Sequence, residues 1–172
     1  LLVHWPNPDQ DRYVDALRGL QGILDKGGLR AIGTSNFKPA HLRRVLDETG
    51  ITPDVNQIQL SPHSTRSASR AYHVAHGIVT ESWSPLDASG DELRNDPVIT
   101  GIAKDHGKSP TQVVLRWHIQ LGLVAIPRSG NPGRIAENID IFDFELTEQE
   151  MSTISGLDRG ESVVADSDVS GH

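Results

Sequence analysis

The sequence predicts an α/β fold in which short parallel strands alternate with longer amphipathic helices. Apolar runs of strand length recur along the chain at 1–4, 29–34, 55–60, 77–82 and 123–126. Segments with helical periodicity separate these runs, and no hairpin dipeptide joins one strand candidate to the next. Strands that are connected through helices form parallel sheets with right-handed crossovers. We therefore expect five βα units.

The helical segments repeat apolar residues at spacings of three and four. In the first segment, 9–26, the repeat is carried by Val14, Leu17, Leu20 and Leu24. This spacing places apolar side chains on one face of a helix. The same kind of pattern predicts further helices at 39–49, 65–76, 97–106, 109–121, 132–140 and 148–157.

Capping residues mark both ends of the predicted helices. Asp96, Ser109 and Asn131 each precede a proline, which suits the first position of a helix. Ser109 and Thr147 are also followed three residues later by Gln or Glu, the spacing of a capping box. Glycines that fit the position just after a helix are Gly27, Gly50, Gly77, Gly107 and Gly122.

The positions of polar residues favour a β/α barrel over an open doubly wound sheet. A doubly wound sheet that binds a nucleotide carries a Gly-rich turn after its first strand, and neither G-x-G-x-x-G nor a Walker pattern is present. Barrels instead place functional groups at the carboxyl ends of many strands. Such groups here are His4, Ser35, Asn36, Gln57, Gln59, Trp83, Ser84, Arg128 and Ser129.

The chain is too short for a complete barrel, which needs about 250 residues and eight strands. It has 172 residues, starts with an apolar triplet and contains a single Met, at position 151. We therefore expect residues 1–172 to be the C-terminal portion of one (β/α)8 TIM-barrel domain, supplying about five βα units, with the N-terminal strands lying outside the chain.

Composition excludes several classes of function. The chain has 16 Lys and Arg against 23 Asp and Glu, a formal net charge of −7, which argues against binding to a nucleic-acid backbone. Zero cysteines exclude disulfides, thiolate metal sites and cysteine nucleophiles. No apolar run approaches the ~20 residues of a membrane span, and no signal peptide opens the chain. We expect a cytoplasmic protein with no membrane partner.

Among the histidines, His4 is the candidate functional residue. His4 follows the first strand, and an imidazole at the mouth of a barrel could polarise a substrate or relay a proton; the alternative is a histidine satisfied by backbone groups. No metal motif is found. His73 and His76 lie three apart on a predicted helix without nearby acids, and the simpler interpretation is a solvated face.

Three later segments carry side chains that could bind a planar amide or stack on an aromatic ring. Ser35 and Asn36 supply hydroxyl and amide groups that suit a carboxamide, or form an ordinary βα turn. Gln57 lies between apolar neighbours and needs partners. Trp83 offers a face for stacking before the Ser84-Pro85-Leu86 turn, whose backbone N–H groups could bind an anion; core packing is the alternative for Trp83.

A local basic cluster follows the last strand. Arg128, Ser129 and Arg134 lie on a loop and the first turn of a helix, with no acidic residue before Glu137. Helix N-termini favour anions, and two guanidiniums with a hydroxyl suit a phosphate monoester. Phosphate sites of barrels follow strands seven and eight, which is where this segment is expected. The alternative is a pair of solvated arginines.

Taken in order, these motifs resemble the aldo-keto reductases over essentially the whole chain. The motifs are LVHWP at 2–6, GTSNF at 33–37, VNQIQ at 55–59, ESWSPL at 81–86, IPRS at 126–129 and RIAEN at 134–138. The resemblance is greatest to the bacterial branch that reduces diketo-gluconate and other small aldehydes and ketones. It implies NADPH (NADP+) as cofactor, a small-molecule carbonyl substrate and a monomeric enzyme when complete.

The resemblance also implies roles for individual residues. His4 matches the histidine that orients and polarises the substrate carbonyl. Trp83 matches the aromatic residue that stacks on the nicotinamide. The other matches are Ser35, Asn36 and Gln57 for the carboxamide, Ser84, Pro85 and Leu86 for the pyrophosphate, Arg128, Ser129 and Arg134 for the 2′-phosphate, and Glu137 and Asn138 for the adenine.

One part of the family pattern is missing. The family's proton donor is a Tyr supported by a Lys and an Asp, all from strands that precede the histidine. The tyrosines present, Tyr13 and Tyr72, fall in predicted helices. The leading hypothesis is an NADPH-dependent carbonyl reductase represented by its C-terminal part. The alternatives are a non-catalytic nucleotide-binding or regulatory protein, or another phosphate-binding barrel. The substrate pocket would include the tail 158–172, whose Asp166-Ser-Asp168 run is expected to be mobile.

Overall fold

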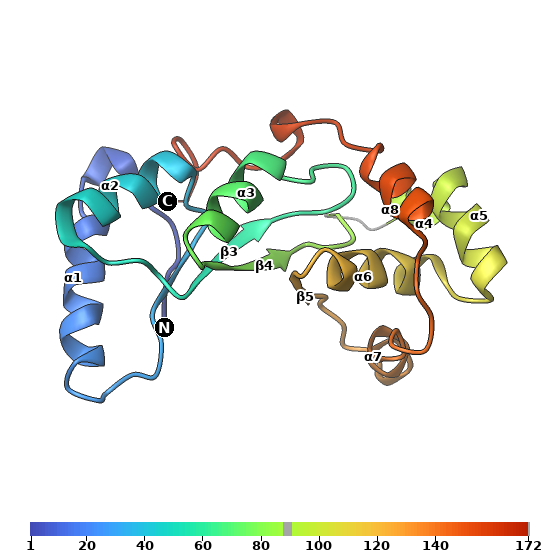
Figure 1. The fold of residues 1–172 in the computed structure, drawn as a ribbon, viewed down its shortest axis with the longest axis horizontal. Coiled ribbons are helices and arrows are strands. Elements are labelled where there is room, and N and C mark those ends of the chain that lie inside the picture. The colour runs from blue at the N-terminus through green and yellow to red at the C-terminus, as the bar shows by residue number, and fades with distance from the viewer. Residues whose placement is uncertain (88–90, 172) are drawn as a thin grey trace. The chain divides into compact units, whose positions relative to one another are not determined.

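The computed structural model describes residues 1–87 and 91–171, and its chain divides into two compact units (Figure 1). The first unit comprises 1–58, 66–81 and 164–172, and the second comprises 59–65 and 82–163. The strands follow the chain order β1-β2-β3-β4-β5.

The first unit contains the start of a parallel sheet. Its strands are β1 (Leu2–Val3), β2 (Gly33–Ser35) and β3 (Val55–Gln59), and both strand pairs are parallel. Gly33 faces Val55 in register, and a Cβ at position 33 would lie 2.4 Å from Cγ1 of that valine. Only glycine therefore fits at this point of the sheet.

Three helices accompany these strands: α1 (Tyr13–Leu24), α2 (Pro39–Thr49) and α3 (Ser67–Ala75), with a 3-10 turn η1 (Pro8–Gln10) before α1. Helices α1 and α2 pack against one another (Figure 1). The core cluster that they share with neighbouring segments consists of Tyr13, Val14, Leu17, Phe37, Leu42, Val45 and Ile78. Burial of this apolar face holds the helices in place.

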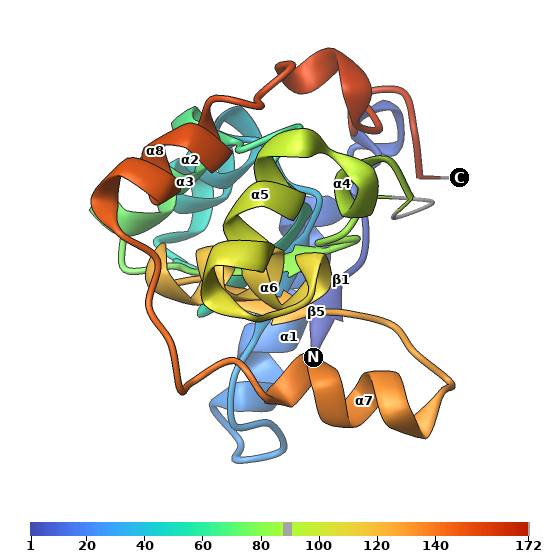
Figure 2. The ribbon, with the colours of Figure 1, turned by 90° about the vertical axis from the view of Figure 1, so that its right-hand side faces the viewer.

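Strand β4 (Val79–Trp83) starts in the first unit and ends in the second, which also contains β5 (Val124–Ile126). The helices of the second unit are α4 (Asp91–Asn95), α5 (Pro97–His106), α6 (Pro110–Gln120), α7 (Pro132–Ile139) and α8 (Glu148–Ser155), followed by the 3-10 turn η2 (Glu161–Val163). Figure 2 shows α4 and α5 beside α6. The fully buried Trp117 of α6 donates its indole N–H to the Ser155 hydroxyl of α8 at 3.0 Å.

Most predicted elements are confirmed, and their ends agree best where capping residues are strong. Asp96, Ser109, Asn131 and Thr147 cap their helices as predicted. The predicted strand at 29–34 is shifted, because pairing in the sheet begins only at Gly33. The long helix predicted at 9–26 is shorter, since α1 starts at Tyr13 after the turn η1. Helix α4 was not predicted.

The solvated face predicted for His73 and His76 is wrong for His73, which is fully buried. Asn56 donates its amide to Nε2 of His73 at 3.0 Å, so Nδ1 carries the proton and donates to the Thr80 hydroxyl at 2.8 Å. Burial lowers the pKa of His73 from 6.5 to about 4, and the imidazole is neutral at pH 7. His76 is half-buried and stacks on Tyr72 with ring centroids 3.9 Å apart.

The tail run expected to be mobile is instead anchored by ion pairs. Lys38 reaches Asp166 and Asp168 at 2.5 Å each, and Nε2 of His41 lies 2.9 Å from an oxygen of Asp168. Hydrogen bonding to Lys38 lowers the pKa of Asp166. Among the described residues no helix is long and apolar enough to cross a membrane.

Candidate functional site

The predicted carboxamide-binding residues lie together at the carboxyl ends of β1, β2 and β3 in the first unit. The Asn36 amide donates to the backbone carbonyl of His4 at 3.2 Å and to the Ser35 hydroxyl at 3.1 Å. The Ser35 hydroxyl in turn donates to the Gln57 carbonyl at 2.9 Å. These bonds join three strands into one polar cluster, so His4, Ser35, Asn36 and Gln57 are neighbours.

The backbone of Asn36 has an unusual conformation, with φ of 63°. Asparagine tolerates this left-handed region better than most residues with a side chain. Its N–H donates to the Gln57 carbonyl at 2.9 Å, which continues the pairing of β2 with β3 by one residue. The strained turn therefore directs the Asn36 side chain back toward the ends of β1 and β2, where it bonds to His4 and Ser35.

Glu81 belongs to this cluster and was missed by the sequence analysis. The Gln57 amide donates to Oε2 of Glu81 at 2.9 Å, which orients the amide group. The available signal was a carboxylate inside a strand candidate, where a charge that is partly withdrawn from water needs a partner. The His4 side chain, by contrast, is exposed beside Trp5, with ring centroids 6.0 Å apart.

In the second unit, β4 ends at Trp83 and is followed by a tight turn. Ser84 has φ of 48°, and Asp87 has φ of 63° and donates its N–H to the Ser84 carbonyl at 3.0 Å. Pro85 is buried in the turn, and Leu86 is half-buried. The Asp87 carboxylate is bound by Ser61 and His63 from the loop after β3. The turn thus has a fixed shape beside the aromatic residue.

A pocket of about 220 Å³ in the second unit brings six predicted residues together. It is lined by Leu86, Arg128, Ser129, Arg134, Glu137 and Asn138, together with Arg94, Ser109, Pro110 and Thr111. The predicted 2′-phosphate and adenine residues therefore share one cavity with a residue of the predicted pyrophosphate turn. Arg94 was missed, because its five-residue helix is too short to show periodicity.

The charges in this pocket favour an anion. Within residues 1–87 and 91–171, neither Arg128 nor Arg134 forms an ion pair with a carboxylate. Glu137 is held at its carboxylate by the hydroxyl of Ser109, the residue that caps α6. Two exposed guanidiniums, a hydroxyl and the start of α7 thus surround a cavity of the size of a phosphate-bearing group.

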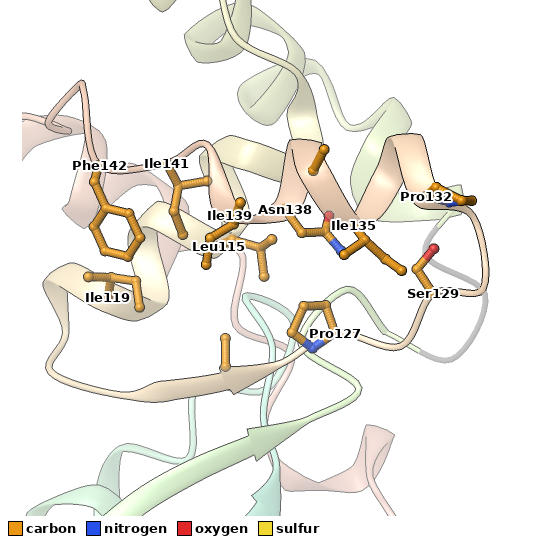
Figure 3. A pocket seen from close by; sticks show the side chains of 12 residues that line it. Leu115, Ile119, Pro127, Ser129, Pro132, Ile135, Asn138, Ile139, Ile141 and Phe142 are labelled. Carbon is orange, nitrogen blue, oxygen red and sulfur yellow. The ribbon is translucent and has the colours of Figure 1, made fainter.

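A larger cavity of about 650 Å³ is bordered by α6, β5 and α7 and is mostly apolar (Figure 3). Ser129 and Asn138 line both cavities. Three of its apolar side chains are largely exposed: Ile135 at 53%, Ile139 at 69% and Phe142 at 63%. None of the predicted catalytic groups lines this cavity, so size alone does not identify the site.

Other candidate groups can be placed as well. Tyr13 and Tyr72 lie in α1 and α3, as predicted, and Tyr13 packs its ring edge-on against Phe37 with centroids 5.4 Å apart. In the part of the chain that the structure describes, no three His, Asp or Glu side chains form a group that could hold a metal ion.

Comparison with known proteins identifies the class to which this fold and site belong. Residues 1–159 match the model of the aldo/keto reductase family. An aldo-keto reductase of Mycolicibacterium smegmatis is 49% identical over 96% of the chain and 59% of the relative. The 2,5-diketo-D-gluconic acid reductase B of a Corynebacterium species is also 49% identical, over 92% of the chain and 57% of the relative.

Solved structures agree with this result. The crystal structure of Gox0644 matches the chain with a TM-score of 0.95 at 43% identity. The match covers 99% of the chain and 63% of Gox0644. A point mutant of Gox0644 in complex with NADPH has a TM-score of 0.94. A Bombyx mori aldo-keto reductase in complex with NADP has a TM-score of 0.86 at 34% identity over 97% of the chain and 59% of that structure.

The chain belongs to the aldo/keto reductase family, whose members are oxidoreductases. It spans about three fifths of the length of the curated relatives that it matches. The predictions of an α/β barrel-type fold and of a resemblance to the diketo-gluconate reductase branch are confirmed. The methylglyoxal reductase DkgA of Escherichia coli is another such relative, 44% identical over 97% of the chain and 61% of the relative.

Proposed function

We propose that the chain is part of an NADPH-dependent carbonyl reductase that converts small aldehydes or ketones to alcohols. One observation carries the proposal: the 220 Å³ pocket gathers six residues predicted from separate motifs. Of its three arginines, Arg94 pairs with Asp91, whereas Arg128 and Arg134 have no carboxylate partner in the described ranges. An anion with adjoining polar groups fits this donor set. The adenosine 2′-phosphate of NADPH has that chemistry.

The residues divide the cofactor between them. Arg128, Ser129 and Arg134 bind the 2′-phosphate, and Glu137 and Asn138 contact the adenine. The backbone of the turn at 84–86 binds the pyrophosphate through its N–H groups. Trp83 stacks on the nicotinamide ring, while Ser35, Asn36 and Gln57 hold its carboxamide. The bonds among Asn36, Ser35 and the Gln57 carbonyl orient these groups before the cofactor binds.

Reduction of a carbonyl needs a hydride at carbon and a proton at oxygen. NADPH, when bound, supplies the hydride. His4 is exposed at the end of β1, where its imidazole can donate a hydrogen bond to the substrate oxygen and polarise the carbonyl. Tyr13 and Tyr72 lie in helices, so neither is assigned as the proton donor. The names of two relatives, a diketo-gluconic acid reductase and a methylglyoxal reductase, support a small dicarbonyl substrate.

The helical positions of both tyrosines also favour a second candidate, a protein that binds NADPH without turnover. One experiment separates the two. NADPH binding is measured by fluorescence titration of the chain, and NADPH oxidation is followed with a panel of aldehydes and diketones for the complete gene product. Binding with turnover is expected. Binding without turnover would favour the second candidate, and absence of binding would contradict both. The proposal includes a monomeric cytoplasmic enzyme, which gel filtration and cell fractionation test.

A further inference from the structure

A buried polar chain in the second unit ends on the turn that follows Trp83. His63 is almost completely buried, and its Nδ1 lies 2.5 Å from Oδ2 of Asp87. The other oxygen of Asp87 is bound by the Ser61 hydroxyl. Ser61 also accepts the His63 backbone N–H at 3.2 Å. Both oxygens of one carboxylate are thus held by the loop after β3.

Arg159 fixes the tautomer of this histidine. A guanidinium donates hydrogen bonds and cannot accept them. Its Nη2 lies 3.1 Å from Nε2 of His63, so Nε2 accepts and Nδ1 carries the proton that is donated to Asp87. The Arg159 backbone N–H also donates to the His63 carbonyl at 2.8 Å. Glu92 accepts from the same guanidinium at 2.6 Å, which holds Arg159 in position.

The carboxylate at the end of this chain belongs to a strained turn. Asp87 has φ of 63° and Ser84 has φ of 48°, a region that side-chain-bearing residues adopt only when surrounding contacts enforce it. The contacts that do so are the bonds to Ser61 and His63. Among the described residues these are the side-chain hydrogen bonds of Asp87 that offset the backbone strain, so their loss should let the turn relax.

We propose that His63 is a positioning residue: through Asp87 it holds the turn at 84–86 in the shape that presents its N–H groups to the cofactor pyrophosphate. This inference rests on the proposed function for the role of the turn. Arg159 acts one step further away, by fixing the tautomer of His63. His63 itself does not touch the pocket that the predicted phosphate and adenine residues line.

Three variants test the positioning role. His63→Leu removes the bond to Asp87, while His63→Asn retains an N–H donor near Nδ1. Asp87→Gly removes the carboxylate, and glycine adopts a positive φ without steric cost. This variant therefore tests the loss of the bonds to Ser61 and His63 without adding backbone strain that could prevent folding. His106→Leu is the matched control, because His106 pairs with Glu150 at 2.9 Å in the same unit and contacts neither Asp87 nor the turn.

Two measurements are made on the full chain: the dissociation constant for NADPH by fluorescence titration, and hydrogen exchange at the Asp87 N–H, which bonds to Ser84. We expect His63→Leu and Asp87→Gly to weaken NADPH binding about fivefold or more and to speed hydrogen exchange; a loss of this size is typical when residues in one hydrogen-bonded network are uncoupled. For His63→Asn and His106→Leu, we expect both quantities to stay within about twofold of the wild type. The inference would be overturned if Asp87→Gly bound NADPH and exchanged its N–H as the wild type does. It would also be overturned if His63→Asn bound NADPH no more tightly than His63→Leu. A wild type that does not bind NADPH contradicts the proposed function, and exchange alone then decides the positioning role.

Discussion

Acidification should destabilise the protein through one buried histidine. His73 is fully buried between Asn56 and Thr80, and its pKa falls from 6.5 to about 4 because burial disfavours the charged form. In the unfolded chain the same imidazole takes up a proton at its ordinary pKa. Between these two values the unfolded state binds more protons than the folded state, so stability rises with pH across this window.

The size of the effect follows from the shift. One pKa unit corresponds to about 1.4 kcal/mol, so the change from 6.5 to about 4 is worth at most about 3–4 kcal/mol. This stability is fully present above pH 6.5 and is lost as the pH falls through the folded pKa near 4. The slope of unfolding free energy against pH reaches about 1.4 kcal/mol per unit inside the window.

The matched comparison uses His73→Gln, which keeps a donor and an acceptor for Asn56 and Thr80 but does not titrate. Urea unfolding is followed by circular dichroism between pH 4 and 8 for both proteins, and the two free energies are subtracted at each pH. Other titrating groups, including His41, whose pKa burial also lowers, cancel in the difference. A difference that stays constant across pH 4 to 6.5 would show that His73 does not carry the effect.

Four further results are expected. Arg134→Ala should weaken NADPH about tenfold or more and leave NADH nearly unchanged, because one charge-assisted bond to the 2′-phosphate is lost; equal losses for both nucleotides would remove that role. Trp83→Ala should cost roughly 1–3 kcal/mol of NADPH affinity in the same titration if the indole stacks on a ring, and unchanged affinity would assign Trp83 to packing. Asn36→Ala should lower stability by about 1 kcal/mol more than Asn36→Gly in urea, since glycine tolerates φ of 63°; equal values would refute the strain argument. Lys38→Ala should speed proteolysis within 164–171, where its carboxylate partners lie, and an unchanged cleavage rate would show that these ion pairs do not anchor the tail.

Local sequence signals predicted the elements whose ends they mark. The helix at 97–106 has the predicted bounds because Asp96 and Gly107 terminate it through side-chain and backbone hydrogen bonds. The strand expected at 29–34 failed for the opposite reason. Leu29, Ala31 and Ile32 gave it an apolar pattern, but strand pairing depends on where β1 and β3 lie, and these strands are distant in sequence.

Burial of polar side chains was the hardest feature to predict. Ser69 and His73 occupy the same face of α3 and are both buried, a spacing of four that a search restricted to apolar residues overlooks. The partners of His73 lie on two strands on either side of that helix in the sequence. A polar face that packs against a sheet looks like a solvated face until those partners are known.

The candidate site was predicted as separate motifs, and the structure supplied the links between them. Residues adjacent in sequence, such as Ser35 and Asn36, were found together. Arg94 and His63 were missed because their contacts with residues distant in sequence carry no local signal. Glu81 was missed although a carboxylate inside a strand candidate was a signal. The resemblance to a family implies roles, but the contacts define which neighbours hold those residues in place.

The exposed apolar side of α7 has a practical consequence for anyone who handles this chain. Ile135, Ile139 and Phe142 border an open 650 Å³ groove, and patches of this kind drive self-association. Because these side chains are exposed, the chain should bind a hydrophobic dye such as ANS. Because association depends on protein concentration, the chain should sediment as larger species in concentrated samples. Titrations with nucleotide therefore belong in dilute solution, where apparent affinity does not vary with the amount of protein.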